Sequence, residues 1–269
     1  PLDFSDCSKN ALKNAIEIAI QLDLGLHIVH SYLLPAHVSM GGVIDMADNI
    51  SNVVEKEFEY EFEHLKREFP RLAEIEYKHS LKEGELSLTI KEFAQMEDIE
   101  LIVMGTHGVK GIKEFIMGSN TYTVIKETHL PVMIFPEKSG LIKFDRLAFL
   151  SGMKKIEHPK VLKPLLKLVM KTKAEVDIIH FIKQDHINVK ESRQVNDLIL
   201  NIGEIRHSYH ISDYHEIETA IHEYVIKHKI DLLVMIPRKH NFFELLFGKD
   251  AWAQKMIFHT TTPLFVLPS

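Results

Sequence analysis

Residues 101–120 read LIVMGTHGVKGIKEFIMGSN. The apolar run 101–104 predicts a buried strand, and Gly105, Gly108 and Gly118 divide the loop that follows it. In an open α/β sheet, ligands bind in loops at the carboxyl ends of parallel strands, where glycines let the backbone approach closely. Ser119 can cap a helix that runs to about His129, and the unpaired amides at a helix start form a natural phosphate site. The stretch predicts a strand–loop–helix unit with a candidate phosphate site, and turn formation with helix capping alone is an equal alternative.

The same pattern recurs further along the chain. The strand at 101–104 matches residues 232–235 at an offset of 131, and residues 131–136 match 263–268. Residues 12–13 and 28–30 match 162–163 and 178–180 at an offset of 150. Four matches in the same order predict an internal repeat. We therefore expect two domains, residues 1–138 and 144–269, joined by a short linker near 137–143.

Each half alternates strand patterns with amphipathic helix patterns. This alternation is typical of a mostly parallel sheet with helices on both faces, as in Rossmann-like α/β folds. Strands are expected at 26–32, 75–80, 101–104, 147–150, 176–181, 206–211 and 232–236. Helices are expected at 8–22, 50–68, 86–96, 158–172 and 215–228.

Composition narrows the classes of partner. A net charge of −6 and a pI near 6.3 argue against nucleic acid and anionic membranes as general partners. We find no apolar run of 18 residues and no export leader, and the single Cys7 cannot form an intrachain disulfide, so the expected compartment is the reducing cytoplasm. The chain opens on Pro1-Leu2-Asp3 without Met, as though a strand preceded Pro1.

The glycine loop carries a resemblance to a known family. Its spacing, G-x2-G-x9-G-S over Gly105, Gly108, Gly118 and Ser119, resembles the motif of ATP-binding universal stress proteins, whereas the P-loop pattern G-x4-G-K-[ST] is absent. The chain thus resembles a tandem member of that family. The resemblance implies two repeats of a Rossmann-like, adenine nucleotide alpha hydrolase-like open parallel sheet, and ATP as ligand, with ADP and AMP as alternatives.

The resemblance also implies roles for individual residues. It assigns Asp3 to the adenine, Pro1 to the pocket wall and the main chain at Ser31 to the base edge. Next to the ribose it places Met104 and Gly105. Around the phosphates it places Gly108, Gly118, Ser119 and the backbone amide of Asn120. Mg²⁺ would then be held through phosphate oxygens and water.

The second half departs from this motif. Met153 stands where Asp3 does, and Ile236-Pro237-Arg238-Lys239 replaces the first two glycines and the residues between them. Asp250-Ala251 stands at the position of Gly118-Ser119, and a carboxylate there would repel phosphate. We expect a copy that binds no nucleotide.

The function implied is ATP binding in stress response or regulation, with at most weak ATPase activity. Near the glycine loop we find no paired carboxylates and no Ser-His-Asp order that would suggest a committed enzyme. A nucleotide-free scaffold that acts through protein partners is the main alternative. A nucleotide-dependent transferase is a third reading, but the S-G-G-x-D-S and HIGH motifs of such enzymes are missing. The pairs His27/His30 and His207/His210 lie on predicted strands, where positions i and i+3 face opposite sides, so they do not suggest a metal site.

The last strand of each half is short and apolar and would lie at a sheet edge. Because one chain holds both edges at high local concentration, we expect the two domains to pair within the chain. Val132 and Phe135 should then lie against Leu264 and Val266 in an antiparallel contact. A homodimer of whole chains through other surfaces is left open.

Overall fold

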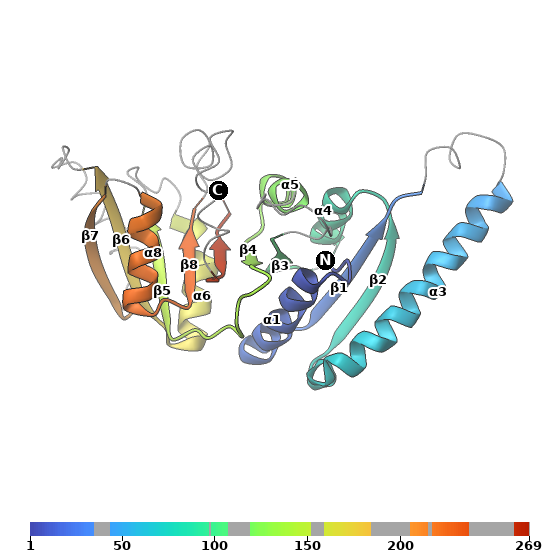
Figure 1. Ribbon diagram of the computed structural model, residues 1–269, viewed down its shortest axis with the longest axis horizontal. Coiled ribbons are helices and arrows are strands. Elements are labelled where there is room, and N and C mark those ends of the chain that lie inside the picture. Colours follow the sequence, from blue (N-terminus) through green and yellow to red (C-terminus); the bar gives the residue numbers. More distant parts are fainter. Residues whose placement is uncertain are drawn as a thin grey trace.

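The computed structural model describes residues 1–34, 44–96, 98–106, 119–151, 159–183, 205–214, 217–236 and 261–268. The first half contains α1 (Asp6–Leu22), β1 (Leu26–Tyr32), α3 (Ile44–Glu68), β2 (Tyr77–Glu83), α4 (Leu86–Met96), β3 (Ile102–Gly105), α5 (Ser119–Thr128) and β4 (Val132–Phe135) (Figure 1). The second half contains β5 (Arg146–Ser151), α6 (Lys163–Thr172), β6 (Glu175–Lys183), β7 (His207–Tyr214), α8 (Ile217–His228), β8 (Leu232–Met235) and β9 (Leu264–Val266). Short 3-10 turns at Pro70–Glu74 and Pro159–Leu162 precede β2 and α6.

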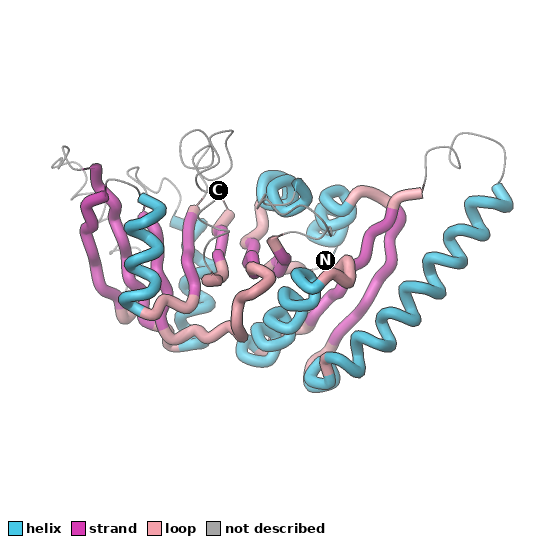
Figure 2. Tube along the Cα trace, in the orientation of Figure 1, coloured by secondary structure: helices cyan, strands magenta, loops and turns pink. Residues whose placement is uncertain are grey.

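The strands form two sheets in the described part of the chain. Seven strands lie in the order β3-β4-β9-β8-β5-β6-β7, and β1 pairs with β2 in a separate two-stranded sheet (Figure 2). Every neighbouring pair is parallel except β4 and β9. The predicted α/β class with a mostly parallel sheet is confirmed.

Helices cover both faces of the large sheet because strand residues alternate sides. On one face, Val132, Ile134, Leu264 and Val266 belong to a core that α4, α5 and α8 cover. On the other face, Met133, Phe135 and Phe265 belong to a core that α1 and α6 cover. A third cluster joins α1, β1 and α3, with Phe58, Phe62 and Leu65 at helical spacing and almost fully buried.

The two halves join through their last strands. The β4–β9 ladder is antiparallel and pairs Val132 with Val266, Met133 with Phe265, and Ile134 with Leu264. All six residues are at most 2% exposed. The predicted intrachain pairing is confirmed, with one correction: Phe135 is buried on the opposite face from Leu264 and Val266, and Ile134 takes the place expected for it, because side chains alternate along a strand.

Candidate functional site

The ends of three elements of the first half meet at the carboxyl end of β3. The Thr121 hydroxyl, in the first turn of α5, donates to the carbonyl of Gly105 at 3.2 Å. Cys7, in the first turn of α1, lies with its sulfur 3.5 Å from the Thr106 hydroxyl oxygen. The starts of α1 and α5 thus converge on the last residue of β3, and each helix start carries the positive end of a helix dipole. This arrangement suits an anionic group.

Gly105 is required for the close approach of α1. A Cβ atom built on Gly105 would lie 2.7 Å from the sulfur of Cys7 and 3.0 Å from its carbonyl oxygen. The sulfur could rotate away, but the backbone oxygen could not without a shift of the helix. Gly105 therefore has a packing role, and its predicted place beside the ribose stays a prediction.

We expect Gly105→Ala to lower the free energy of unfolding by about 2 kcal/mol, because the added methyl group overpacks the α1–β3 contact. Urea unfolding followed by circular dichroism measures the change. Cys7→Ala added to Gly105→Ala should restore only part of the loss, since the backbone contact at 3.0 Å remains. Full restoration would show that only the sulfur is crowded.

The segment before α1 is held by hydrogen bonds to β1 and to the start of α1. The amide of Leu2 donates to the carbonyl of Val29 on β1 at 2.8 Å. Asp3 is exposed, and its Oδ1 accepts the amide of Ser5 at 3.1 Å and the hydroxyl of Ser5 at 2.6 Å. Ser5 in turn caps α1 by accepting the amide of Ser8 at 3.2 Å. Asp3 is therefore part of the capping network of α1 and is also accessible to a ligand.

The structure places the remaining predicted residues in different environments. Pro1 lines a cleft between β1 and β3, and Ser31 is half-buried near the end of β1. Met104 is 4% exposed in the core under α4 and α5, so that only its backbone could meet a ligand. Ser119 and Asn120 begin α5, and the Asn120 side chain is exposed. Gly108 and Gly118 lie outside the described residues.

Sequence reasoning missed Cys7, Thr106 and Thr121 as parts of this edge. Thr106 and Thr121 are 1% and 2% exposed, and Cys7 is equally buried. Thr121 lies in the first turn of the helix expected from Ser119, but nothing in the local sequence indicates its contact with Gly105. The contact between Cys7 and Gly105 joins residues almost a hundred positions apart, and no local pattern indicates it.

The first half of the chain is similar in sequence to a known protein family. Residues 1–136 match the model of the universal stress protein family. The chain belongs to the universal stress protein family. Universal stress protein MJ0531 of Methanocaldococcus jannaschii is 31% identical over 144 residues, which are 50% of this chain and 78% of that protein. MJ0577 of the same organism is 24% identical over 153 residues, covering 52% of this chain and 94% of that protein.

Solved structures also match this universal stress protein along its length. A universal stress protein from Archaeoglobus fulgidus superposes with a TM-score of 0.69, covering 99% of this chain and 93% of that chain at 20% identity. At this identity the likeness concerns the fold alone. Among the described helices, none is long and apolar enough to cross a membrane.

The histidine pairs of this universal stress protein face different surroundings. The ring of His27 lies edge-on to Phe93 of α4, whereas His30 stacks on Phe58 of α3 and hydrogen bonds to the carbonyl of Leu2. His207 contacts the carbonyl of Ile205. In the described ranges no group of three or more histidine, cysteine or acidic side chains has the arrangement of a metal site.

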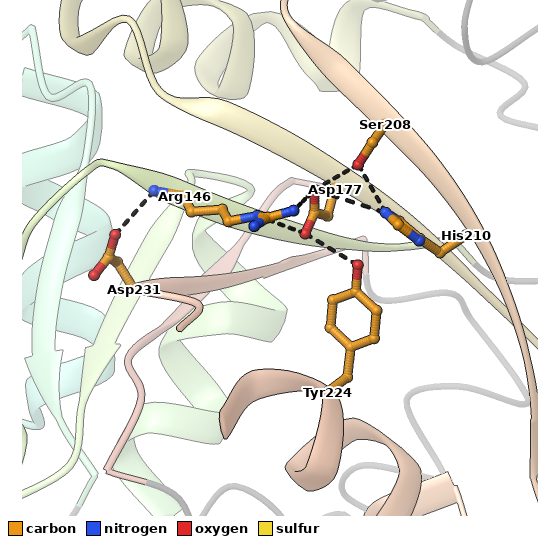
Figure 3. A network of polar contacts seen from close by, with 6 residues as sticks. All are labelled: Arg146, Asp177, Ser208, His210, Tyr224 and Asp231. Atoms are coloured by element: carbon orange, nitrogen blue, oxygen red, sulfur yellow. Dashed lines mark hydrogen bonds and ion pairs between the residues drawn. The ribbon is translucent and has the colours of Figure 1, made fainter. Parts of the chain in front are cut away.

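A polar network in the second half joins three strands and a helix (Figure 3). Asp177 is 1% exposed, and Arg146 donates to both of its carboxylate oxygens, at 2.9 and 3.1 Å. The hydroxyls of Ser208 and Tyr224 also donate to it, at 2.6 and 3.0 Å. Because Ser208 gives its only proton to the carboxylate, it must accept from Nε2 of His210 at 2.8 Å, which therefore carries a proton.

These contacts decide the charge of the buried carboxyl group. Burial alone would raise the pKa of Asp177, but the hydrogen bonds from Arg146, Ser208 and Tyr224 outweigh it and hold the pKa below its usual value. Burial, and then the charge of Asp177, raises the pKa of Tyr224, which stays a neutral donor. The network therefore fastens β5, β6, β7 and α8 around one ionised carboxylate, which is a structural role.

Proposed function

We propose that the first half of this universal stress protein binds one ATP per chain, at the edge where α1, β3 and α5 meet. The observation that carries the proposal is the G-x2-G-x9-G-S motif, which begins at the last residue of β3 and ends at the first residue of α5. A loop in that position lies at the carboxyl end of a parallel strand, where open α/β sheets bind ligands. The expected function is ATP binding in stress response or regulation.

The geometry of the edge supports phosphate as the group bound. The starts of α1 and α5, each the positive end of a helix dipole, lie close to Gly105, and the absence of a side chain there lets α1 approach β3 closely. Asp3 lies exposed beside the start of α1, so an adenine base that enters from solvent could contact its carboxylate. ADP and AMP share this chemistry in part, and Mg²⁺ would be held by phosphate oxygens and water.

We do not expect the second half to bind a nucleotide. Ile236, the counterpart of Gly105, follows β8 directly and carries a branched side chain where the motif needs a glycine. The other substitutions behind this expectation lie outside the described residues: Met153, Pro237, Arg238, Lys239, Asp250 and Ala251. The second half instead supplies β9, which covers the edge of β4.

Isothermal titration calorimetry with ATP and Mg²⁺ tests the proposal. We expect one site per chain, and we expect Gly118→Phe to weaken binding at least about 100-fold, or about 2.7 kcal/mol, because a bulky side chain would occupy the phosphate loop. Gly140→Ala is the matched control, since a Cβ there would meet no atom within 4 Å and should leave binding unchanged. Thermal unfolding of both variants shows that the fold is retained.

Three results would count against the proposal. Absence of binding at millimolar ATP would favour a nucleotide-free scaffold that acts through protein partners. Two nucleotides per chain would contradict the assignment of the second half. Rapid turnover of ATP would contradict the expectation of slow or no hydrolysis.

A further inference from the structure

The solvent side of α6 carries a continuous series of lysines. Residues 159–174, which cover α6 and the 3-10 turn before it, contain five lysines and no acidic residue. Leu165, Leu168 and Val169 are buried, so the opposite side of the helix faces solvent. The exposed residues on that side form the basic face: Lys160, Lys163, Lys167, Met170 and Lys171. The chain as a whole has a net charge of −6, so this basic face is a local exception.

The helix α3 carries the opposite charge. It contains eight acidic and three basic residues. Part of this charge is balanced within the chain by contacts with basic side chains: Glu59 with His79, Glu63 with Lys66, and Glu68 with Lys9. Four further residues at helical spacing are exposed together and form the acidic face: Val53, Glu57, Tyr60 and Glu61. Val53 is 54% exposed and Tyr60 is 64% exposed.

Neither charge distribution favours the stability of its own helix. Lys163, Lys167 and Lys171 follow one another at a spacing of four residues, and like charges at this spacing destabilise a helix. Glu57 and Glu61 have the same spacing on α3. A helix that needs only stability and solubility carries both signs interspersed. The separation of the charges onto two helices indicates a partner of opposite charge for each face.

The two faces complement each other but lie far apart in one chain. Figure 1 shows α3 at the outer end of the first half, whereas α6 covers the seven-stranded sheet in the second half. A contact between them therefore needs two chains. Each face combines its charges with exposed apolar groups, Val53 and Tyr60 on α3 and Met170 on α6, which a contact would remove from water.

We propose that the basic face of α6 binds a second copy of this chain and that it receives the acidic face of α3. When a two-fold axis relates the two copies, each supplies α3 to one contact and α6 to the other, so that the same contact forms twice. The attraction between the faces is electrostatic and becomes weaker as salt is added. The contact uses neither the β4–β9 ladder nor the edge at Gly105, and it goes beyond the proposed function.

Sedimentation velocity of the full chain at low salt, from micromolar to millimolar concentration, tests the proposal. Two variants each reverse one face. The α6 variant combines Lys160→Glu, Lys163→Glu and Lys171→Glu and keeps Lys167, which pairs with Glu100. The α3 variant combines Glu57→Lys and Glu61→Lys. We expect the wild type to associate and each variant to raise the Kd of association at least about tenfold, because like charges then face each other.

A control separates the effect of the face from the effect of net charge. Lys91, Lys126 and Lys138 are exposed outside both faces, and their joint replacement by Glu changes the net charge as much as the α6 variant does. We expect this control to keep the Kd of the wild type. Thermal unfolding shows whether each variant is folded. If the α6 variant does not fold, Lys→Gln at the same three positions should still raise the Kd at least about threefold, since it removes the charges alone.

A mixture of the two variants tests whether the faces meet each other. The α6 variant has acidic side chains on both faces and the α3 variant has basic side chains on its α3 face and on its α6 face, so neither should associate with itself. Together they should associate with a Kd within about threefold of the wild-type value, because both contacts of the pair are then complementary. Both variants keep a net negative charge, so a general attraction between them does not explain association.

Other outcomes overturn the proposal. A wild type that stays monomeric at millimolar concentration shows that the faces do not bind each other. Equal association of the wild type and both variants assigns the contact to other surfaces, and a mixture that does not associate shows that α3 is not the partner of α6. Binding of the wild type, without self-association, to phosphatidylserine vesicles or to a DNA duplex, and its loss in the α6 variant, would assign the lysines to a membrane or to nucleic acid. None of these measurements involves nucleotide.

Discussion

Phe265→Ala is expected to lower the free energy of unfolding of the whole chain by about 4 kcal/mol. Phe265 lies in the three-residue strand β9 and is 2% exposed. It pairs with Met133 of the first half and shares a core with Phe135 on one side and Phe149 on the other. Its truncation leaves a cavity at the junction, so that both halves lose packing.

Urea unfolding followed by tryptophan fluorescence and by far-UV circular dichroism measures this effect. The transitions should shift together to lower urea, because the β4–β9 ladder couples the halves. Met170→Ala is the matched control: Met170 is 67% exposed on α6 and should change stability by less than about 0.5 kcal/mol. If Phe265→Ala destabilised only one of two separate transitions, the halves would not be coupled through this strand.

Asp177→Ala is expected to cost about 3 kcal/mol, because it removes the acceptor around which Arg146, Ser208, Tyr224 and His210 are arranged. The value lies at the low end for buried pairs, since the Arg146 side chain is 33% exposed and can reach water. Glu175→Ala provides the comparison on the same strand. The ion pair between Glu175 and Arg206 is largely exposed, and its loss should cost less than about 1 kcal/mol.

The ionisation of Asp177 also predicts a pH dependence. Its pKa is lower in the folded chain than in the unfolded chain, so its contribution to stability is present above the ordinary pKa of aspartate and is lost as the pH falls through the folded value. The stability difference between the wild type and Asp177→Asn should therefore shrink as the pH is lowered below about 4. A difference that stays constant from pH 7 to pH 3 would show that folding does not lower the pKa of Asp177.

Local patterns were sufficient to predict most elements of the fold. The ranges expected for β1 and α4 agree with the structure to the residue, because each is bounded by turn residues and has clear periodicity. The strand expected from residue 75 begins at Tyr77, since the 3-10 turn Pro70–Glu74 extends the connection before it. The helix expected from residue 158 begins at Lys163, after a second such turn. These 3-10 turns, of five and four residues, are too short to show a hydrophobic period of their own.

The candidate site was less accessible to prediction. The glycine motif indicated the strand end and the helix start, and the structure places both as expected. The packing of Cys7 on Gly105 depends on a contact between distant parts of the chain. The two-residue spacing of Asp3 and Ser5 is local, yet their hydrogen bonds arise only because α1 begins at Asp6.

The antiparallel ladder between β4 and β9 has a consequence for synthesis on the ribosome. About 130 residues separate the two strands, so at about 5 to 20 residues per second the outer edge of β4 waits on the order of ten seconds for its partner. During that time the nascent first half presents an unpaired apolar edge to its neighbours on the polysome. A β9 strand from an adjacent chain has the same sequence and can form the same ladder. Until β9 leaves the exit tunnel of the ribosome, pairing of β4 with its own β9 competes with pairing to the β9 of a neighbouring chain.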